Sequence, residues 1–398
     1  MFIQNKFSIN LSSIMTKKLS LLFVLFLIGL SLFSQQKLPI IKATSKLVDI
    51  RDGDNFKKAT WTINPDLKPD IFKTNNKEVS FYTDLDSISF KVRSNQKCNF
   101  IILLNGKDSA YTQIVCLPSN LEILKRAYKY NFDDKRQIPV FTYQSFQDSN
   151  LVALRKAFNL DSIAGLGNET SKILNLLHWV HNTVSHDGQH ESGIKNINAY
   201  AIVNAARSKH VGVSCGELAT TLNDCYLSMG WASRKIYCFP KDSLKNDYDS
   251  HVINVVYLIS KNKWIWVDPT NDAYIMDEKG ELLSIEDVRE RLISNKPLIV
   301  NPDANWNRKT STSRDYYLDI YMAKNLYRFY CPLNSEYNYE TWGRNKRVTY
   351  IHLLPLDYHV KEPFKTDDYF NPDVKTTFNN YYIYNPDIFW QTPKIESK

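Results

Sequence analysis

Three residues of this chain have the types and the order that thiol chemistry needs. Cys215, His251 and Asp268 each stand at a predicted boundary of a helix or a strand, where a side chain can reach a cleft. A thiol becomes a good nucleophile when a base takes its proton, and the base works best when a carboxylate orients it. The sequence therefore predicts Cys215 as the nucleophile, His251 as base and then acid, and Asp268 as the residue that orients the imidazole.

Each of these residues also has a more ordinary interpretation when it is taken alone. A cysteine at a helix start is often a small buried apolar side chain. A histidine at the start of a strand commonly serves only in strand pairing, and an aspartate before a proline commonly forms a turn. The occurrence of all three in this order favours chemistry over packing.

The elements that would position these residues can be predicted from the spacing of apolar residues. A helix is expected to begin at Cys215, with Leu218 and Leu222 on its apolar side and Gly230 at its C-terminal cap. The free N–H groups and the dipole at its start favour a thiolate, and the N–H of Cys215 can donate to an oxyanion. Strands are expected over 234–239, 251–259 and 264–268, so neighbouring strands can hold the imidazole and the carboxylate together.

The elements in the rest of the chain are also predicted from the spacing of apolar residues. Residues 37–116 indicate a β domain, because apolar and polar side chains alternate at period two over 79–81 and 88–92, residues 100–104 are continuously apolar, and Asn105-Gly106 is a hairpin turn. Asn-Pro-Asp at 371–373 and at 385–387 indicates turns. Further helices are expected over 119–128, 150–158, 169–184, 198–207, 285–293 and 315–329, and a strand over 347–354.

Around the three residues the sequence resembles the transglutaminase-like superfamily of papain-like thiol enzymes, over about 165–275. The features that carry the resemblance are Gly212 before the cysteine, Ala219 in the helix, Gly230-Trp231-Ala232-Ser233-Arg234 after it, His251 at a strand start, Trp264 through Thr270 on the next strand, and Trp179-Val180-His181-Asn182 on the preceding helix. This chain departs from the family's usual Gly-x-Cys, because Val213 and Ser214 both separate Gly212 from Cys215.

The resemblance implies an α+β fold in which the helix bearing Cys215 packs on an antiparallel sheet. We expect an N-terminal β domain over 37–118, the transglutaminase-like domain over 119–295, and a β-rich or irregular accessory region over 296–398. The implied activity is that of a cysteine peptidase or amidase that acts on amide bonds through a thioester. Hydrolysis is favoured, and protein-glutamine acyl transfer or a non-catalytic binding or scaffold role in the cell envelope remain as alternatives. No cofactor is implied, and no acidic loop has the spacing of a calcium site.

Charge and the first residues bear on partners and location. The 398 residues carry a net charge of +8, with Lys and Arg scattered, which argues against nucleic-acid binding and leaves a peptide or protein substrate or cell-envelope material. Lys17-Lys18 followed by the apolar Leu19–Phe33 indicates a signal peptide over 1–34, with Met1 and Met15 both available as the start. The apolar run is shorter than the ~20 residues of a membrane span. We therefore expect export to the periplasm or the extracellular space, with no stable span after cleavage.

The remaining cysteines and histidines give weaker signals. The six cysteines show no disulfide framework, although Cys98 and Cys116 flank the predicted hairpin turn and a bridge between them is open. Four histidines, His178, His181, His186 and His190, precede the predicted Cys215 helix. They lack the spacing of a zinc site, so no metal is predicted. The position of His186-Asp187-Gly188 would allow this segment to line the cleft.

Overall fold

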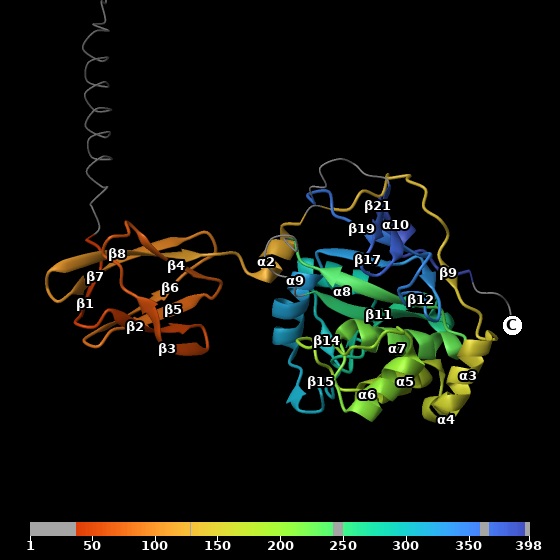
Figure 1. Cartoon of the computed structure of the whole chain (residues 1–398). Helices are drawn as coiled ribbons and strands as arrows, with labels where there is room; N and C mark the ends of the chain where they lie inside the picture. The colour runs from red at the N-terminus through yellow and green to blue at the C-terminus, as the bar shows by residue number, and fades with distance from the viewer. Residues whose placement is uncertain (1–36, 128, 242–249, 359–365, 395–398) are drawn as a thin grey trace, which may run out of the picture. The chain divides into compact units, whose positions relative to one another are not determined.

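The chain divides into two compact units, on either side of the bond between Pro118 and Ser119 (Figure 1). The structure is a computed structural model that describes residues 37–127, 129–241, 250–358 and 366–394. The predicted signal peptide lies outside the described residues, so export stays a prediction. Within the described ranges, no helix is both long enough and apolar enough to cross a membrane.

The first unit is a sandwich of two four-stranded sheets with a single apolar core. One sheet has the order β1-β7-β8-β4 and the other β3-β2-β5-β6. Inward-facing residues of both sheets form the core, in which the rings of Phe81 and Phe100 lie 5.0 Å apart. The strands are β1 Ile40–Ala43, β2 Leu47–Asp52, β3 Asn55–Thr62, β4 Asp70–Thr74, β5 Glu78–Tyr82, β6 Ser87–Lys91, β7 Lys97–Leu104 and β8 Asp108–Cys116.

The predicted hairpin turn joins β7 and β8. Asn105 and Gly106 have φ values of 53° and 68°, in the left-handed region that these two residue types tolerate best. The resulting register pairs Cys98 with Ile114 rather than with Cys116. Cys98 is accordingly not disulfide-bonded, and the bridge that the sequence left open does not form.

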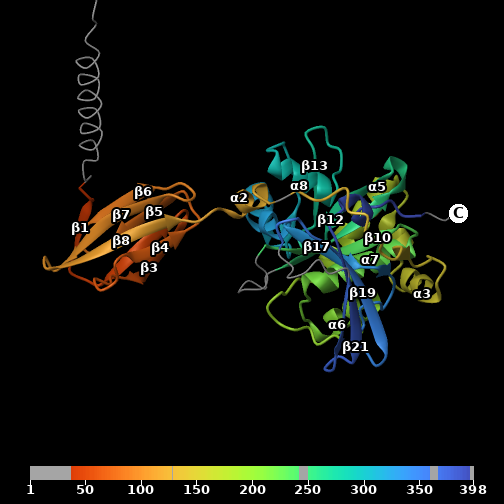
Figure 2. The same cartoon turned by 90° about the horizontal axis from the view of Figure 1, so that it is seen from above.

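The second unit is built on one nine-stranded sheet with the order β14-β13-β12-β11-β10-β17-β19-β21-β20. The strands around the predicted site, from β10 to β14, all pair antiparallel, as the α+β prediction required. Figure 2 shows β19 and β21 running side by side, and these two strands pair parallel. The strands are β10 Ser233–Phe239, β11 His251–Leu258, β12 Lys263–Asp268, β13 Ala273–Met276, β14 Ile299–Val300, β17 Arg328–Pro332, β19 Lys346–Leu353, β20 Thr366–Asn371 and β21 Thr376–Ile383.

Helices cover one face of this sheet. Every residue of β11 is buried, and alternate residues such as Val256 and Leu258 pack against the helices, joined by Ile265 and Val267 of β12. Such burial on both faces explains why most residues of β11 and β12 are apolar. The helices on this face are α4 Leu160–Ala164, α5 Glu169–Thr183, α6 Ala199–Lys209 and α7 Cys215–Ser228, of which α5, α6 and α7 are grouped together in Figure 1. A further helix, α3 Ser149–Ala157, packs on α7.

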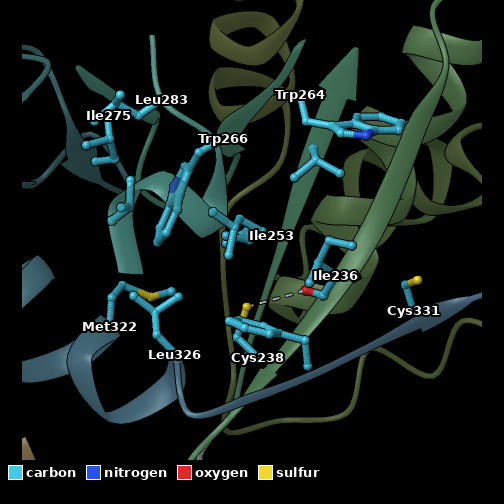
Figure 3. Close-up of a cluster of buried hydrophobic side chains, with 14 of the residues drawn as sticks. Ile236, Cys238, Ile253, Trp264, Trp266, Ile275, Leu283, Met322, Leu326 and Cys331 are labelled. Atoms are coloured by element: carbon cyan, nitrogen blue, oxygen red, sulfur yellow. Dashed lines mark hydrogen bonds between the residues drawn. The ribbon is translucent and has the colours of Figure 1, made fainter. Parts of the chain in front are cut away.

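The opposite face carries a second core that draws on the C-terminal third of the chain. Ile253 and Trp266 cluster there with Met322 and Leu326, as Figure 3 shows. The predicted helix over 285–293 is confirmed as α8 Ile285–Ile293 and packs into this core, as does α2 Asn120–Lys125. Residues after 296 therefore do not form a separate unit, because their apolar side chains complete the core of the domain that carries Cys215.

The helix predicted over 315–329 is wrong in its second half. The chain forms a π-helix over Asp315–Met322 and a short α9 over Ala323–Asn325, and then enters β17 at Arg328. Phe329 and Cys331 alternate with Tyr330 in that strand and are fully buried between β10 and β19. Pairing on both edges thus overrides the local helical pattern.

The two Asn-Pro-Asp segments behave differently from each other. The first, at 371–373, follows β20 and turns the chain into β21, as predicted. The second begins α10, Pro386–Phe389, where the side chain of Asn385 accepts a hydrogen bond from the backbone N–H of Asp387. An N-cap asparagine followed by proline is a helix-start signal as well as a turn signal.

Candidate active site

Cys215 is the first residue of α7, and a capping box holds it there. The Ser214 hydroxyl accepts from the backbone N–H of Glu217, and the Glu217 carboxylate accepts from the backbone N–H of Ser214 at 2.8 Å. This reciprocal pair fixes the first turn. The N–H of Cys215 is among the four that the helix itself cannot satisfy, so it remains available to a substrate oxygen.

The loop that enters α7 needs a glycine at position 212. A Cβ on Gly212 would lie 2.6 Å from the Cβ of Asp187, which is closer than side chains can approach. The neighbouring Val213 forms a parallel bridge with His186, so the segment 185–187 runs directly alongside the residues before Cys215. The longer Gly-x-x-Cys spacing of this chain is therefore accommodated by a close backbone approach to that segment.

His251 and Asp268 lie on the same face of the sheet because of the register of β11 and β12. Asn254 pairs with Val267, so His251 and Asp268 are diagonal neighbours across the two strands. Diagonal neighbours lie within reach of long side chains. His251 Nε2 bonds to Asp268 Oδ2 at 2.7 Å, and both residues are buried. A hydrogen bond also joins the side chains of His251 and Cys215, so the structure brings the three predicted residues into one chain of contacts.

Asp268 receives more hydrogen bonds than the one from His251. The Tyr317 hydroxyl donates to its Oδ2 at 2.6 Å and the Asn271 amide donates to the same oxygen at 3.0 Å. The backbone N–H of Thr270 donates to Oδ1 at 2.8 Å. Tyr317 comes from the π-helix Asp315–Met322, far along the chain, and the sequence analysis did not identify it.

These contacts change the protonation of all three residues. Burial would favour the neutral thiol of Cys215, but hydrogen bonds from His186 and His251 lower its pKa to about 6. Burial also opposes a charge on His251, but the charge and hydrogen bond of Asp268 raise the pKa of His251 to about 10. Burial of Asp268 is likewise outweighed by His251, and the pKa of Asp268 falls to about 2. Between about pH 6 and pH 10 the site therefore holds a thiolate beside an imidazolium.

His186 is a second histidine in contact with Cys215. Its side chain hydrogen-bonds to the thiol, and its Nδ1 lies 3.1 Å from the indole Nε1 of Trp306. The sequence placed His186 in a segment that could line the cleft, but it did not predict a direct contact with the thiol. Trp306 was not identified at all, because it lies 120 residues from His186 in the sequence.

A cavity of about 430 Å³ adjoins these contacts. His186, Tyr317 and Tyr321 all line it; they contact Cys215, Asp268 and the ring of His251 respectively. Trp306 and Tyr316 add further aromatic surface, and among the described residues that line the cavity none is Asp, Glu, Lys or Arg. A substrate group with an aromatic or other uncharged surface fits this lining best.

The other three histidines of the cluster bond elsewhere. The group His178, Asp272 and Asp303 brings its potential ligand atoms within 4.8 Å of one another, and the sequence prediction of no metal stays a prediction. The contacts are His178 with Asp272 at 2.6 Å, His181 with the Pro269 carbonyl at 3.0 Å and with Asn305 at 2.9 Å, and His190 with Asp187 at 2.8 Å.

The thiol of Cys215 differs from Cys98, Cys225, Cys238 and Cys331 in the direction of its pKa shift. Cys225, Cys238 and Cys331 are buried, and burial raises the pKa of each. Cys98 is half-buried, and its pKa is also raised by burial. Cys215 is half-buried too, yet its pKa is lowered because two imidazoles contact it.

Comparison with protein families identifies the segment that carries these residues. Residues 156–269 match the family model of the transglutaminase-like superfamily. The matched range includes Cys215, His251 and Asp268, and it lies close to the range of 165–275 over which the sequence resemblance was predicted. No curated protein sequence matches the chain.

Solved structures give more distant likenesses. A candidate cysteine protease from Cytophaga hutchinsonii shares 16 % identity at a TM-score of 0.24, over 36 % of this chain and 48 % of that one. A candidate protease from Parabacteroides distasonis shares 14 % identity at a TM-score of 0.21, over 57 % of each chain. A TGase shares 10 % identity at a TM-score of 0.20, over 62 % of this chain and 76 % of that one. This chain thus spans about half the length of the first two proteins.

Proposed function

Because residues 156–269 belong to the transglutaminase-like superfamily, we propose that this chain is a thiol enzyme that cleaves amide bonds in peptides or proteins. The observation that carries the proposal is the double contact of His251, with Cys215 on one side and with Asp268 at 2.7 Å on the other. A nucleophile, a base within hydrogen-bond reach, and a residue that orients the base are the parts that covalent amide cleavage needs.

In the first step the Cys215 thiolate attacks the carbonyl carbon of the substrate amide. A C–S bond forms, and the carbonyl electron pair moves onto oxygen. His251, held as an imidazolium by Asp268, then gives its proton to the amide nitrogen. The oxygen electron pair re-forms the C=O bond as the C–N bond breaks, the amine leaves, and a thioester remains on Cys215.

In the second step neutral His251 takes a proton from the incoming molecule. Water gives a carboxylic acid and regenerates the thiol, whereas a primary amine gives a new amide and the same thiol. Both outcomes use the same intermediate and the same residues. We favour hydrolysis, with acyl transfer to an amine as the alternative outcome.

We also propose that the chain is exported and meets its peptide, protein or cell-envelope substrate outside the cytoplasm. The proposal rests on Lys17-Lys18 and the apolar Leu19–Phe33. Mature protein from the native host is expected to begin within a few residues of Gln35. N-terminal sequencing that finds Met1 or Met15 intact in exported material would remove this part of the proposal.

The activity can be tested with substrate mixtures rather than with one chosen substrate. Wild-type protein and Cys215→Ala would each be incubated with peptide libraries and with cell-envelope material, and the products would be identified by mass spectrometry. We expect new carboxyl and amino ends with wild type only. Adding a labelled primary amine distinguishes the two reactions, because incorporation of the label into product means acyl transfer.

A second pair of variants tests the separate roles of His251 and Asp268. His251→Ala should abolish turnover because no group remains to protonate the leaving amine. Asp268→Asn should lower the rate by about 10⁴, the size of the same change in serine triads. Circular dichroism would check that the variants are folded. Turnover by folded Cys215→Ala at the wild-type rate would exclude Cys215 as the nucleophile, and no turnover by wild type on any material would favour the binding or scaffold role.

A further inference from the structure

The two histidines that contact Cys215 present opposite hydrogen-bonding capacities to it. Trp306 can only donate through its indole Nε1, so His186 Nδ1 must be the acceptor in the 3.1 Å contact between them. The ring hydrogen of neutral His186 then resides on Nε2. Because Nδ1 is engaged by Trp306, Nε2 is the ring nitrogen that can donate a hydrogen bond to the thiol.

This assignment separates the roles of the two rings. His251 bonds to Asp268 through Nε2, so its protonated form is stabilised by a carboxylate. His186 has the indole N–H of Trp306 where His251 has the carboxylate of Asp268. A proton on Nδ1 of His186 would collide with that N–H. His186 therefore suits the donation of a fixed hydrogen bond and does not suit proton transfer with Cys215.

The backbone and surroundings of His186 are also held in place. The side-chain amide of Asn307 accepts from the backbone N–H of His186 at 2.7 Å and donates to its carbonyl at 2.9 Å. The parallel bridge with Val213 ties the same residue to the loop that enters α7. A Cβ on Gly188 would lie 3.2 Å from Cε1 and 3.4 Å from Nε2 of His186, so the glycine keeps the Nε2 side of the ring open.

We propose that His186 Nε2–H is a catalytic oxyanion donor, which together with the backbone N–H of Cys215 stabilises the negative oxygen of the tetrahedral intermediate, and that Trp306 is a positioning residue that selects the required tautomer. This inference rests on the proposed thiol-enzyme function. His186 contacts the attacking atom and lines the cavity beside it, which is where the substrate oxygen would develop its charge. Donors fixed in advance at that position are worth more than donors that must reorient.

The test uses a probe that forms the oxyanion without needing turnover. The peptide aldehyde N-acetyl-phenylalanyl-glycinal adds to Cys215 so that a C–S bond forms, the C=O π bond breaks, and the oxygen takes the charge or the proton of His251. His186→Ala should bind this aldehyde about 10²–10³-fold more weakly than wild type, the loss found when one oxyanion donor is removed. Alkylation by iodoacetamide creates no oxyanion, so at pH 9 its rate in His186→Ala should change far less than the aldehyde affinity does.

Matched variants separate the donor from its neighbours. His186→Gln, whose amide N–H can donate, should recover part of the aldehyde affinity, and Trp306→Phe, which keeps the ring but loses the N–H, should lose part of it. His190→Ala, in the same loop but with its ring bonded to Asp187, should match wild type. Equal aldehyde affinity in wild type and His186→Ala, or no aldehyde binding by wild type, would overturn the proposal. Tight aldehyde binding without turnover on any amide would instead retain the oxyanion site and count against the proposed hydrolysis.

Discussion

At the scale of single residues, the arrangement around Asp268 determines what the site can do. Its two oxygens accept from His251, Tyr317, Asn271 and the backbone N–H of Thr270. Hydrogen bonds to the charged form favour that form, so Asp268 stays ionised and fixed in orientation. The imidazolium is then stabilised without transfer of its proton to the carboxylate, so the ring keeps a proton that it can give to another group.

The pH dependence of Cys215 reactivity follows from the pKa values of the pair. Thiolate forms as the pH rises through the Cys215 pKa of about 6, so alkylation should rise with a midpoint near pH 6. In His251→Ala one of the stabilising groups is gone, and the midpoint should move toward the ordinary thiol value of about 8.5. Turnover should also fall above about pH 10, where His251 loses its proton. The rate of iodoacetamide labelling against pH gives the comparison, and the same midpoint in both proteins would mean that no ion pair forms.

The residues of the site differed in how far the sequence could identify them. Cys215, His251 and Asp268 are marked by element boundaries and by a recognisable motif, so their proximity was predictable. Tyr317 and Trp306 carry no such mark, because tyrosine and tryptophan are ordinary core residues in a chain with 24 Tyr and 8 Trp. Their contacts depend on long-range packing of the C-terminal segment, which no local pattern encodes.

At the scale of elements, the start of α7 and the register of β11 with β12 place the reacting groups. The helix supplies Cys215 at its first position and the two strands supply His251 and Asp268 on one face. The π-helix Asp315–Met322 then covers that face, with Tyr316 stacked on Tyr321 at five residues' separation and Tyr321 against the ring of His251. Residues five apart are bonded neighbours in a π-helix, and such turns are frequent at functional sites.

The capping box of α7 should matter for chemistry as well as for stability, and α8 offers a matched control. Ser214 and Ser284 cap their helices through the same reciprocal pattern. Replacing either by alanine should lower the free energy of unfolding by ~1 kcal/mol, because a first-turn N–H loses its acceptor. Only Ser214→Ala should also slow alkylation of Cys215 near neutral pH, because only its helix carries the thiol. Equal alkylation rates in the two variants would show that the cap has no effect on the thiolate.

Secondary structure was predicted best where the apolar residues keep one spacing over the whole helix or strand. The helices that became α5, α6 and α8 were predicted to within two residues, since each has an apolar stripe and a capping residue. The segment 315–329 was predicted less well, because its apolar residues fit a helical period at the start and a strand period from Arg328 onward. Only the pairing of β17 with β10 and β19 decides between the two.

At the scale of the whole molecule, the apolar cores define what should unfold together. The core of the first unit contains residues from Ile41 to Cys116 only, whereas the cores around the sheet of the second unit draw on residues from Leu124 to Phe389. Residues 296–398 were expected to form a β-rich or irregular region separate from the rest, and they are β-rich. What the sequence could not show is that their strands continue the sheet that holds His251.

Two equivalent core substitutions should therefore have separate effects. Phe100 and Phe329 are both fully buried, in the first and second unit respectively. Each Phe→Ala change should cost about 3–5 kcal/mol of stability through the cavity it leaves. Calorimetry should show two unfolding transitions, with Phe100→Ala lowering one and Phe329→Ala lowering the other. Heat-induced exposure of Cys225, a buried thiol of α7, should follow the second transition alone, and a shift with Phe100→Ala would show that the two units unfold as one.

The uneven acidity of the thiols allows molecules with an assembled site to be counted. Near neutral pH, Cys215 is the thiol with a lowered pKa, while burial keeps Cys98, Cys225, Cys238 and Cys331 protonated. A brief exposure to a slow electrophile should therefore attach one label to each chain whose site is assembled and none to a chain whose Cys215 lacks its imidazole partners. The intact mass distribution of a labelled sample would then report the active fraction of a preparation, and rates could be expressed per working site rather than per milligram of protein.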